Sequence, residues 1–435
     1  MVADHGARGI PRRGGGRLVL NALRQSSNQL PVNSSPGTVV AESARPLRLV
    51  RVGVVALILF ALSASTARTA VAPTTTAGRM RPWSVQYMNG VESVTLDTAV
   101  STATSFNVIV ALPSVYRSYA ADMKAANPNL TLFAYMKGVF TYDTTLPEAA
   151  YSHDANGQRI QGKKYPTWLL DPTSSEARSA QVLVARGALK RSGYDGVFLD
   201  TLGPAAVSPE YVQSVPINPA TGAPWTARAW VHATAHLADY VTNAVGKPAI
   251  ANGLRDGPNY FDSATYQLLE TSMLGAMAEA WLRGATNSIT SYPKEATWKQ
   301  NVDAMVDAGA RDKSFLAVTK VWTTGTRAQK DAWYKYAVAS FLLANDGKAY
   351  LSFSYDNGDA TVDYSLNHIS LGAPAGPYAK LGGVYQRTFS RGLVLVNPTG
   401  SSVTVPLGAT YRTLSGTTVQ SVTLAPNKAE ILKTL

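Results

Sequence analysis

Short runs of β-branched and aromatic residues alternate with longer amphipathic segments from position 83 onward. Eight of these runs have the length and composition of strands that are buried in a parallel sheet. They span Trp83–Met88, Asn107–Leu112, Leu130–Met136, Gly196–Asp200, Pro248–Ala251, Met273–Glu279, Ser314–Thr319 and Lys348–Ser352. Strands that alternate with helices form parallel sheets with right-handed crossovers, and eight such strands close a (β/α)8 barrel, or TIM barrel. The pattern therefore predicts this barrel.

The segments between the runs have apolar positions at three- and four-residue spacing, which predicts amphipathic helices. The clearest of them span Val115–Ala126, Ser174–Arg191, Ala227–Val245, Ala296–Ala308 and Arg327–Ala344. Thr173 and Glu176 have the spacing of a capping box at the start of one helix. The fifth helix and the helix after the eighth strand are weakly marked, so a doubly wound open sheet is the alternative fold.

Two connections, 137–172 and 201–226, are much longer than the two to six residues that are usual for such loops. Both follow the carboxyl end of a predicted strand. In a (β/α)8 barrel this end of the strands forms the face on which active sites are built. We therefore expect these two loops to border the functional site.

The pattern changes beyond Pro377 to short strands with a period of two residues. They span Gly392–Asn397, Ser402–Pro406 and Val419–Leu424, and turn residues separate them. This predicts an α/β barrel domain at 81–376 followed by a small antiparallel β-sandwich at 377–435. We expect the β-sandwich to pack against the barrel, with contact to carbohydrate as the alternative role.

The first segment, 1–80, has the features of an export signal. Its apolar run Val52–Leu62 follows three arginines and precedes a stretch of small residues, which is the pattern of a signal peptide. A bilayer needs ~20 apolar residues, so a signal anchor is the lesser alternative. The basic residues before the run form a disordered extension or reflect a start placed too far upstream. We expect a secreted protein without stable membrane insertion, whose mature chain begins between Ser63 and Gly78.

The net charge of +12 does not point to a nucleic-acid partner once its location is considered. The first 81 residues contain eleven Arg, no Lys and two acidic residues. The remainder of the chain is left with a net charge of about +3, which gives no basic footprint for a polyanion such as nucleic acid. We expect no nucleic-acid binding.

The sequence predicts neither a metal nor a cofactor. It contains no Cys, which excludes disulfides, thiolate metal sites and cysteine nucleophiles. His232 and His236 have helical spacing but lack the Glu of a metalloprotease HExxH motif. We therefore expect these two residues to lie on an amphipathic helix and not to bind a metal.

Asp200 is the clearest candidate for catalysis. It ends the apolar strand Gly196–Asp200, which follows a turn and would place the carboxylate at the mouth of the barrel. Apolar surroundings can tune a carboxylate for nucleophilic or acid-base work. The alternative is an Asp that caps a helix or orders a loop.

Glu279 is the second candidate, because it is the one charged residue in the run Met273–Trp281. It would end the sixth strand and Asp200 the fourth, and inward residues of alternate strands share one layer in such barrels. Two carboxylates in one layer are what glycoside hydrolysis requires. Alternatively, the run is a buried helix with Glu279 at its edge, and Glu270 is a rival carboxylate. We assign Asp200 as nucleophile or base and Glu279 as acid, because apolar neighbours favour a protonated carboxyl group.

Several polar and aromatic residues at predicted strand ends or in the long loops suit a sugar site. Aromatic faces can stack on a pyranose, and polar groups can bind its hydroxyls. Asp171 either binds a hydroxyl or orders its loop. The predicted substrate-binding residues are Gln86, Tyr135, Lys137, Trp168, Asp171, Asn252, Trp281, Lys320 and Tyr355.

Three motifs carry a resemblance to a known family. They are DGVFLD at 195–200, WLLDPT at 168–173 and AEAW at 278–281. Together with the terminal β module, they resemble glycosyl-hydrolase-like family fifteen, a group of TIM-barrel proteins. The first motif is also similar to polygalactosaminidase-like and amylase-like barrels. The resemblance implies a glycosidase fold with acidic catalysis, and it extends to Asp200 and Glu279 as the catalytic positions.

These observations predict a secreted glycoside hydrolase that cleaves a polysaccharide or oligosaccharide without a cofactor. The alternative is a barrel that binds carbohydrate at the cell wall and does not cleave it. The two hypotheses differ in one requirement, because only a hydrolase needs two carboxylates that converge on one cleft.

Overall fold

The structure is a computed structural model that describes residues 75–86 and 94–435. The predicted disordered extension and the apolar run Val52–Leu62 lie outside the described residues, as do the last two positions of the first predicted strand. In the part of the chain that is described, no helix combines the length and the apolar character that crossing a bilayer requires.

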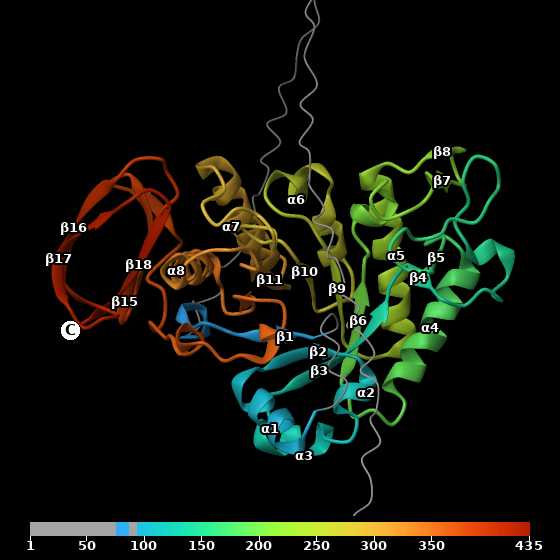
Figure 1. Ribbon diagram of the computed structural model, residues 1–435, viewed down its shortest axis with the longest axis horizontal. Helices are drawn as coiled ribbons and strands as arrows, with labels where there is room; N and C mark the ends of the chain where they lie inside the picture. Colours follow the sequence, from blue (N-terminus) through green and yellow to red (C-terminus); the bar gives the residue numbers. More distant parts are fainter. Residues whose placement is uncertain (1–74, 87–93) are drawn as a thin grey trace, which may run out of the picture. The chain divides into compact units, whose positions relative to one another are not determined.

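Eight parallel strands form one sheet, and their order in space is their order in the sequence (Figure 1). They are β1 Trp83–Val85, β2 Val108–Ala111, β3 Thr131–Lys137, β6 Gly196–Asp200, β9 Ala249–Leu254, β10 Gly275–Ala278, β11 Ser314–Lys320 and β12 Tyr350–Ser354. The Leu351 N–H donates to the Arg81 carbonyl at 3.0 Å, which brings the last strand beside the first. A doubly wound sheet reverses its strand order midway. The predicted barrel is therefore confirmed and its alternative is excluded.

The helices lie outside the sheet and largely match the predicted segments. They are α1 Leu96–Ser105, α2 Pro113–Tyr116, α3 Ala120–Ala126, α4 Ser175–Leu189, α5 Ala227–Val245, α6 Pro258–Asp262, α7 Glu295–Ala310 and α8 Arg327–Ala344. The predicted helix 115–126 is divided into α2 and α3, and the weak fifth helix is short and followed by the 3-10 helix η4 Thr265–Glu270. Helix α1 was not among the clear predictions, since five of its ten residues are Ser or Thr, which have modest helix propensity.

The cap of α4 lies one residue later than predicted. Ser174 accepts a hydrogen bond from the Ala177 N–H at 3.2 Å, while Glu176 accepts from the hydroxyls of Ser174 and Ser175. The prediction of a capping box between Thr173 and Glu176 is therefore wrong. The Thr173 hydroxyl instead donates to Asp171 at 2.6 Å, so it is not available to the helix.

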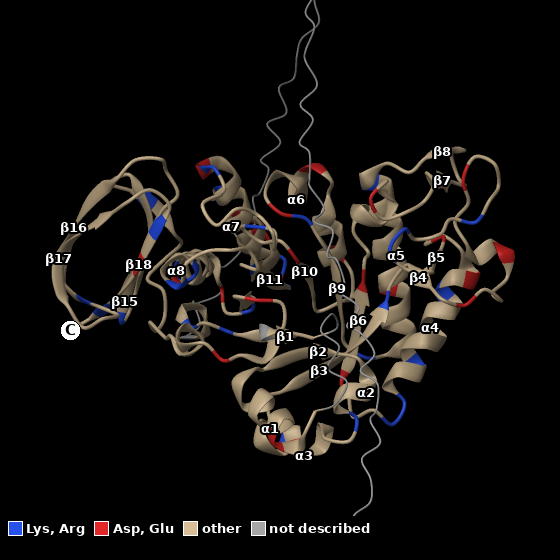
Figure 2. Cartoon of the chain, in the orientation of Figure 1, with Lys and Arg blue, Asp and Glu red and all other residues tan. Residues whose placement is uncertain are grey.

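The interior of the barrel is apolar, and most charged residues lie on helices and loops (Figure 2). Side chains of alternate strand positions fill it, as expected for a closed barrel of eight strands. Its buried members are Trp83, Val108, Val110, Phe133, Phe198, Ile250, Met277, Leu316 and Val318. This plug closes the barrel below its carboxyl-terminal mouth, so that a site at the mouth has an apolar floor.

A six-stranded antiparallel sheet follows the barrel, in the order β13-β14-β15-β18-β16-β17. Its strands are β13 Ala379–Leu381, β14 Val384–Phe389, β15 Gly392–Asn397, β16 Val403–Thr413, β17 Thr418–Leu424 and β18 Lys428–Thr434. The sheet contacts α8 through β15 and β18. Lys335 of α8 pairs with Glu430 at 2.9 Å, and Arg387 donates to the Leu342, Leu343 and Asn345 carbonyls where α8 ends.

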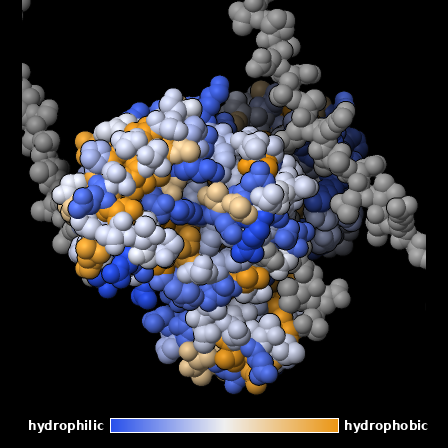
Figure 3. Space-filling view, turned by 60° about the vertical axis from the view of Figure 1, so that its left-hand side comes forward, coloured by the Kyte–Doolittle hydropathy of each residue, from blue (hydrophilic) through white to orange (hydrophobic). Residues whose placement is uncertain are grey.

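The surface mixes hydrophobic and hydrophilic residues. On the face shown in Figure 3, hydrophobic residues form small groups between hydrophilic ones. Isolated apolar residues are normal on a protein surface, whereas a large contiguous patch would indicate an interface. This face therefore shows no sign of an interface.

The two long loops that follow β3 and β6 are joined to each other. The first carries a hairpin of β4 Phe140–Thr141 and β5 Trp168–Leu169, and the second carries β7 Ile217–Asn218 and β8 Ala223–Pro224. Backbone hydrogen bonds of 2.8–3.0 Å connect the loops. They run from the N–H groups of Lys163, Gln213 and Ile217 to the carbonyls of Tyr211, Gln161 and His153. The loops therefore form one continuous wall.

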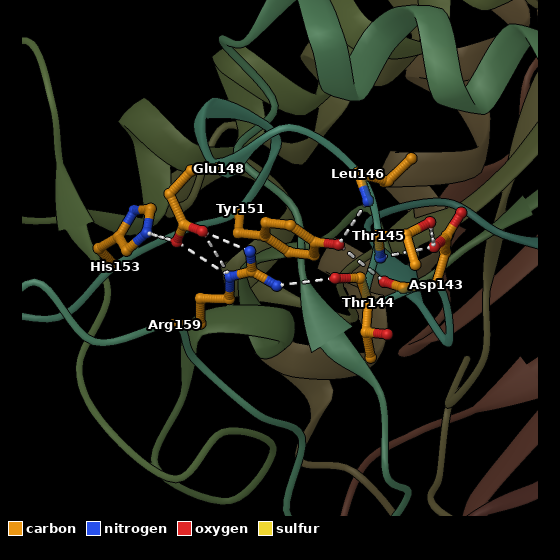
Figure 4. Close-up of polar contacts among 8 residues, drawn as sticks. All are labelled: Asp143, Thr144, Thr145, Leu146, Glu148, Tyr151, His153 and Arg159. Atoms are coloured by element: carbon orange, nitrogen blue, oxygen red, sulfur yellow. Dashed lines mark hydrogen bonds and ion pairs between the residues drawn. The ribbon is translucent and has the colours of Figure 1, made fainter.

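Contacts within the first loop hold it in shape (Figure 4). Glu148 pairs with Arg159 and contacts His153 Nε2 at 2.7 Å. The Arg159 guanidinium also lies over the Tyr151 ring, and the Tyr151 hydroxyl donates to the Asp143 carbonyl at 2.9 Å. The Glu148 carboxylate is therefore bound by residues of its own loop.

Candidate active site

Five polar side chains form a layer directly above the apolar interior of the barrel. Each follows an interior residue by two positions, so that it points to the same side of the sheet. The interior residues are Phe133, Phe198, Ile250, Met277 and Val318, and the polar residues are Tyr135, Asp200, Asn252, Glu279 and Lys320. Sequence reasoning predicted all five as site residues, and the structure brings them together at the mouth.

Asn252 connects the two predicted catalytic carboxylates. Its side-chain nitrogen donates to Asp200 Oδ1 at 2.9 Å and to Glu279 Oε2 at 3.0 Å. Asp200 and Glu279 therefore converge on one amide group, although they lie on strand ends that are separated by β9. This position makes Asn252 a residue that orients both carboxylates.

Asp200 is held by neutral donors. The Tyr135 hydroxyl donates to Asp200 Oδ2 at 2.8 Å, while Asn252 donates to the other oxygen. Burial raises the pKa of Asp200 above its ordinary value, and the nearby charge of Glu279 adds to this, whereas the hydrogen bond from Asn252 opposes it. The carboxyl group of Asp200 therefore accepts a proton more readily than a free Asp does.

Glu279 has a cationic partner. The Lys320 ammonium lies 2.7 Å from Glu279 Oε1, and the two side chains are 11% and 34% exposed. Burial raises the pKa of Glu279, but the charge and hydrogen bond of Lys320, together with Asn252 and Lys164, outweigh burial and place the pKa below its ordinary value. The expectation that apolar neighbours keep Glu279 protonated is therefore wrong, because sequence alone did not pair it with Lys320.

Two glycines allow the loop after β6 to meet the end of β9. A Cβ atom on Gly203 would lie 2.6 Å from the Gly253 carbonyl oxygen, and one on Gly253 would lie 2.7 Å from the Gly203 nitrogen. The Leu202 N–H donates to the Asn252 carbonyl at 2.8 Å beside this contact. The close approach thus fixes the position of Asn252 relative to the strand end that carries Asp200.

Aromatic and basic side chains border the layer. Lys137 pairs in register with Asp200 across β3 and β6, and its ammonium lies 5.2 Å from the ring centres of both Tyr142 and Tyr165. Both tyrosines are exposed. Beside Glu279, the Lys320 ammonium lies 4.9 Å from the ring centre of the half-buried Trp322. Aromatic faces beside polar groups are typical of carbohydrate sites.

Three predicted substrate-binding residues are buried in other contacts. Trp281 is 0% exposed and donates its ring N–H to the Asn301 carbonyl, while Tyr355 is 5% exposed and donates to Asp331 at 2.7 Å. Gln86 donates to Ser84 at 2.8 Å and accepts from a buried tyrosine hydroxyl. The structure therefore places these three side chains in buried contacts and does not bring them into the polar layer.

The remaining candidates take part in loop structure. Asp171 accepts from the Thr173 N–H at 2.8 Å and from its hydroxyl, which favours the loop-ordering role over the binding of a sugar hydroxyl. Trp168 is half-buried in β5 and packs against a small apolar cluster formed by the first loop and α4. The rival carboxylate Glu270 pairs with Arg311 at 2.6 Å and does not join the layer.

Five side chains near the site were missed by sequence reasoning. They are Tyr142, Lys164, Tyr165, Tyr211 and Arg255. The pKa of Tyr211 is raised by burial and then by the charges of Glu279 and Asp200, which places it near both. Its loop has no periodicity, so position along the sequence did not reveal it. One sequence feature could have indicated these residues, namely the consecutive Lys163, Lys164 and Tyr165 in the first long loop.

The site is built from side chains that suit acid-base chemistry. Within residues 75–86 and 94–435, no group of three or more His, Cys, Asp or Glu side chains is arranged to hold a metal ion. What the arrangement offers is one carboxyl group of raised pKa beside one of lowered pKa. Such a pair can give and accept a proton.

Solved structures with a similar fold are glycoside hydrolases of low sequence identity. The glycoside hydrolase domain of PelA from Pseudomonas aeruginosa is 14% identical, with a TM-score of 0.39 over 67% of this chain and 98% of that one. Ega3 from Aspergillus fumigatus, in complex with galactosamine, is 13% identical, with a TM-score of 0.37 over 66% and 96%. A dextranase from Flavobacterium johnsoniae is 11% identical, with a TM-score of 0.47 over 84% and 52%. A comparison with curated proteins finds no match.

A family profile matches most of the barrel. The profile is described as hypothetical glycosyl hydrolase family 15, and it matches residues 117–393. This stretch begins before β3 and ends in β15, and it contains all five residues of the polar layer. The resemblance that the sequence motifs carried is confirmed, and the chain belongs to hypothetical glycosyl hydrolase family 15.

Proposed function

We propose that this protein is a secreted glycoside hydrolase in which Asp200 and Glu279 cleave the glycosidic bond. The observation that carries the proposal is the shared hydrogen-bond donor, because Asn252 aims both carboxyl groups at one space. Glycoside hydrolysis needs two carboxyl groups on either side of one bond. A barrel that only binds sugar has no need of such a pair, so the convergence supports hydrolysis over binding alone.

The spacing of the pair supports retention of configuration. The two N–H bonds of an amide nitrogen diverge by about 120°, so acceptors at 2.9 and 3.0 Å lie about 5 Å apart. Retaining enzymes have carboxyl groups ~5–5.5 Å apart, whereas inverting enzymes need ~6.5–9.5 Å to admit a water molecule. We therefore assign a two-step mechanism with a covalent intermediate.

The charges of the site support a division of roles that reverses the sequence-based one. Glu279 faces the Lys320 ammonium and is ionised, so it attacks the anomeric carbon as nucleophile. Asp200 has only neutral donors and a raised pKa, so it donates its proton to the leaving oxygen. In the second step the Asp200 carboxylate takes a proton from water, and the resulting attack on the sugar carbon releases Glu279.

The sequence supports export as part of the proposal. The apolar run Val52–Leu62 between basic and small residues has the pattern of a cleaved signal. A polysaccharide outside the cell is a substrate that an intracellular enzyme does not meet. The natural substrate is therefore sought among extracellular and cell-wall glycans.

The test is a screen of the purified protein on a panel of polysaccharides, with released reducing ends as the measurement. Asp200→Asn and Glu279→Gln keep the side-chain shape and remove the ionisable oxygen, so each should lower kcat by about 10³-fold. Glu270→Gln is the matched control, since that carboxylate pairs with Arg311 away from the layer. Normal turnover in either of the first two variants would remove that residue from the mechanism.

A further inference from the structure

Four basic side chains surround the carboxylate pair. Lys320 contacts Glu279, and Lys137 lies on the strand beside Asp200. Lys164 shares the Tyr165 ring with Lys137, because the two ammonium groups lie 5.4 and 5.2 Å from its centre. The charge of Lys164 also contributes to the lowered pKa of Glu279. The charges of the three lysines therefore lie close to the two carboxylates.

Arg255 adds a charge at the end of β9. It follows β9 directly after the strand end that carries Asn252, and its side chain is exposed. Burial raises the pKa of Tyr211, the charges of Glu279 and Asp200 raise it further, and Arg255 opposes them. Tyr211 thus lies within electrostatic reach of both carboxylates and of Arg255.

Three of these cations have no carboxylate partner among residues 75–86 and 94–435. Across the described ranges, Lys137, Lys164 and Arg255 form no ion pair, whereas Lys320 pairs with Glu279. The acidic groups of the first loop have other contacts. Glu148 pairs with Arg159, and Asp171, Asp143 and Asp154 accept hydrogen bonds from neighbours in the same loop. Because the chain beyond residue 81 carries a net charge of only about +3, this cluster is a local feature of the mouth.

We propose that the sugar bound at this site carries a negative charge, as a carboxylate or as a sulfate or phosphate ester, which lies beside Lys137 and Lys164. The inference rests on the proposed function, in that it names the substrate class of the same site. A neutral sugar would leave these cations without a counter-charge inside the complex, and a cationic amino sugar would be repelled by them. An anionic sugar satisfies them, while the tyrosine rings contact its apolar face.

The experiment is calorimetric titration of the full chain carrying Glu279→Gln, so that binding is measured without turnover. The probes are oligogalacturonate, dextran sulfate, neutral dextran and chitosan oligomers, in low and high salt. Oligogalacturonate or dextran sulfate should bind at least tenfold more tightly than dextran, and the preference should fall with salt. The two anionic probes separate recognition of a carboxylate from recognition of a sulfate ester.

Added to this background, Lys137→Gln and Lys164→Gln should each weaken binding of the anionic probe about tenfold and leave the melting temperature unchanged. Lys247→Gln is the matched control, since this exposed lysine precedes β9 at the other end of the barrel. Equal affinity for dextran, a preference for chitosan, absence of binding to both anionic probes, or an equal loss in the control would overturn the proposal. An anionic glycan that binds but is not cleaved by the unmutated chain would instead overturn hydrolysis and leave the substrate class intact.

Discussion

The Lys320 ammonium lies 2.7 Å from Glu279 Oε1, and this contact sets the charge of the site. A lowered pKa keeps Glu279 ionised to lower pH, so activity should persist until the pH falls through that pKa. Without the cation, burial would dominate and raise the pKa of Glu279. The charge state of the proposed nucleophile Glu279 therefore depends on Lys320 of the neighbouring strand β11.

Lys320→Met should move the acid limb of the kcat/KM profile to higher pH by about one pH unit or more. The measurement is initial rate against pH on the substrate found in the screen. Lys335→Met removes a second Lys–Glu pair, between α8 and β18, and should leave the acid limb unchanged. An acid limb that does not move in the Lys320 variant would contradict the role of the ion pair.

Azide rescue should distinguish the roles of the two carboxyl groups. In Glu279→Ala, azide can replace the missing nucleophile and should give a glycosyl azide of inverted configuration, identified by proton NMR. In Asp200→Ala, azide should instead attack the covalent intermediate and give a product of retained configuration. The opposite pairing of variant and product would restore the sequence-based assignment, with Asp200 as nucleophile.

Gly253→Ala should lower both stability and kcat. Its new Cβ atom would lie 2.7 Å from the Gly203 nitrogen and 2.6 Å from the Leu268 side chain, so the backbone that carries Asn252 must shift. Overpacking of this kind costs about 1–3 kcal/mol. Thermal unfolding and kcat are the measurements.

Gly187→Ala is the control for this change. Gly187 lies in α4 with open space around it, and Ala is about 1 kcal/mol more favourable than Gly within a helix. This variant should therefore gain stability and keep normal turnover. If Gly253→Ala also gained stability and kept normal turnover, the close contact between Gly203 and Gly253 would have no part in positioning Asn252.

Export is tested by sequencing the amino terminus of protein recovered from culture medium. The mature chain should begin between Ser63 and Gly78, after the apolar run and within the stretch of small residues. Recovery of a chain that begins at Met1, or of the protein in the membrane fraction with the run intact, would contradict cleavage.

The alternation of strands and helices was readable because buried parallel strands are short apolar runs between periodic helices. The same regularity placed Tyr135, Asp200, Asn252 and Lys320, since each side chain direction follows from its strand. Trp281 was misplaced because β10 ends at Ala278 and Leu282 has a φ of 68°, so the chain turns and buries the indole. The alternation therefore extends to Glu279, directly after β10, but does not extend to Trp281.

The bordering residues Tyr165 and Tyr211 lie in loops whose course depends on contacts between them. The Lys163 N–H donates to the Tyr211 carbonyl, and no pattern within either loop encodes this long-range pairing. Strands β13, β14 and β18 were also missed. The three residues of β13 are all exposed, and half-buried Gln386 in β14 and Glu430 in β18 weaken the two-residue alternation.

Helix α8 packs between the barrel and the antiparallel sheet. It covers the barrel on one side and contacts β15 and β18 on the other. Strand β18 is the last element of the chain, and Arg387 supplies the donors for the carbonyls where α8 ends. A barrel without these strands would leave an apolar helix face in water. The antiparallel sheet therefore shields one face of α8 from water, and we expect the barrel to depend for its stability on strands that follow it in the sequence.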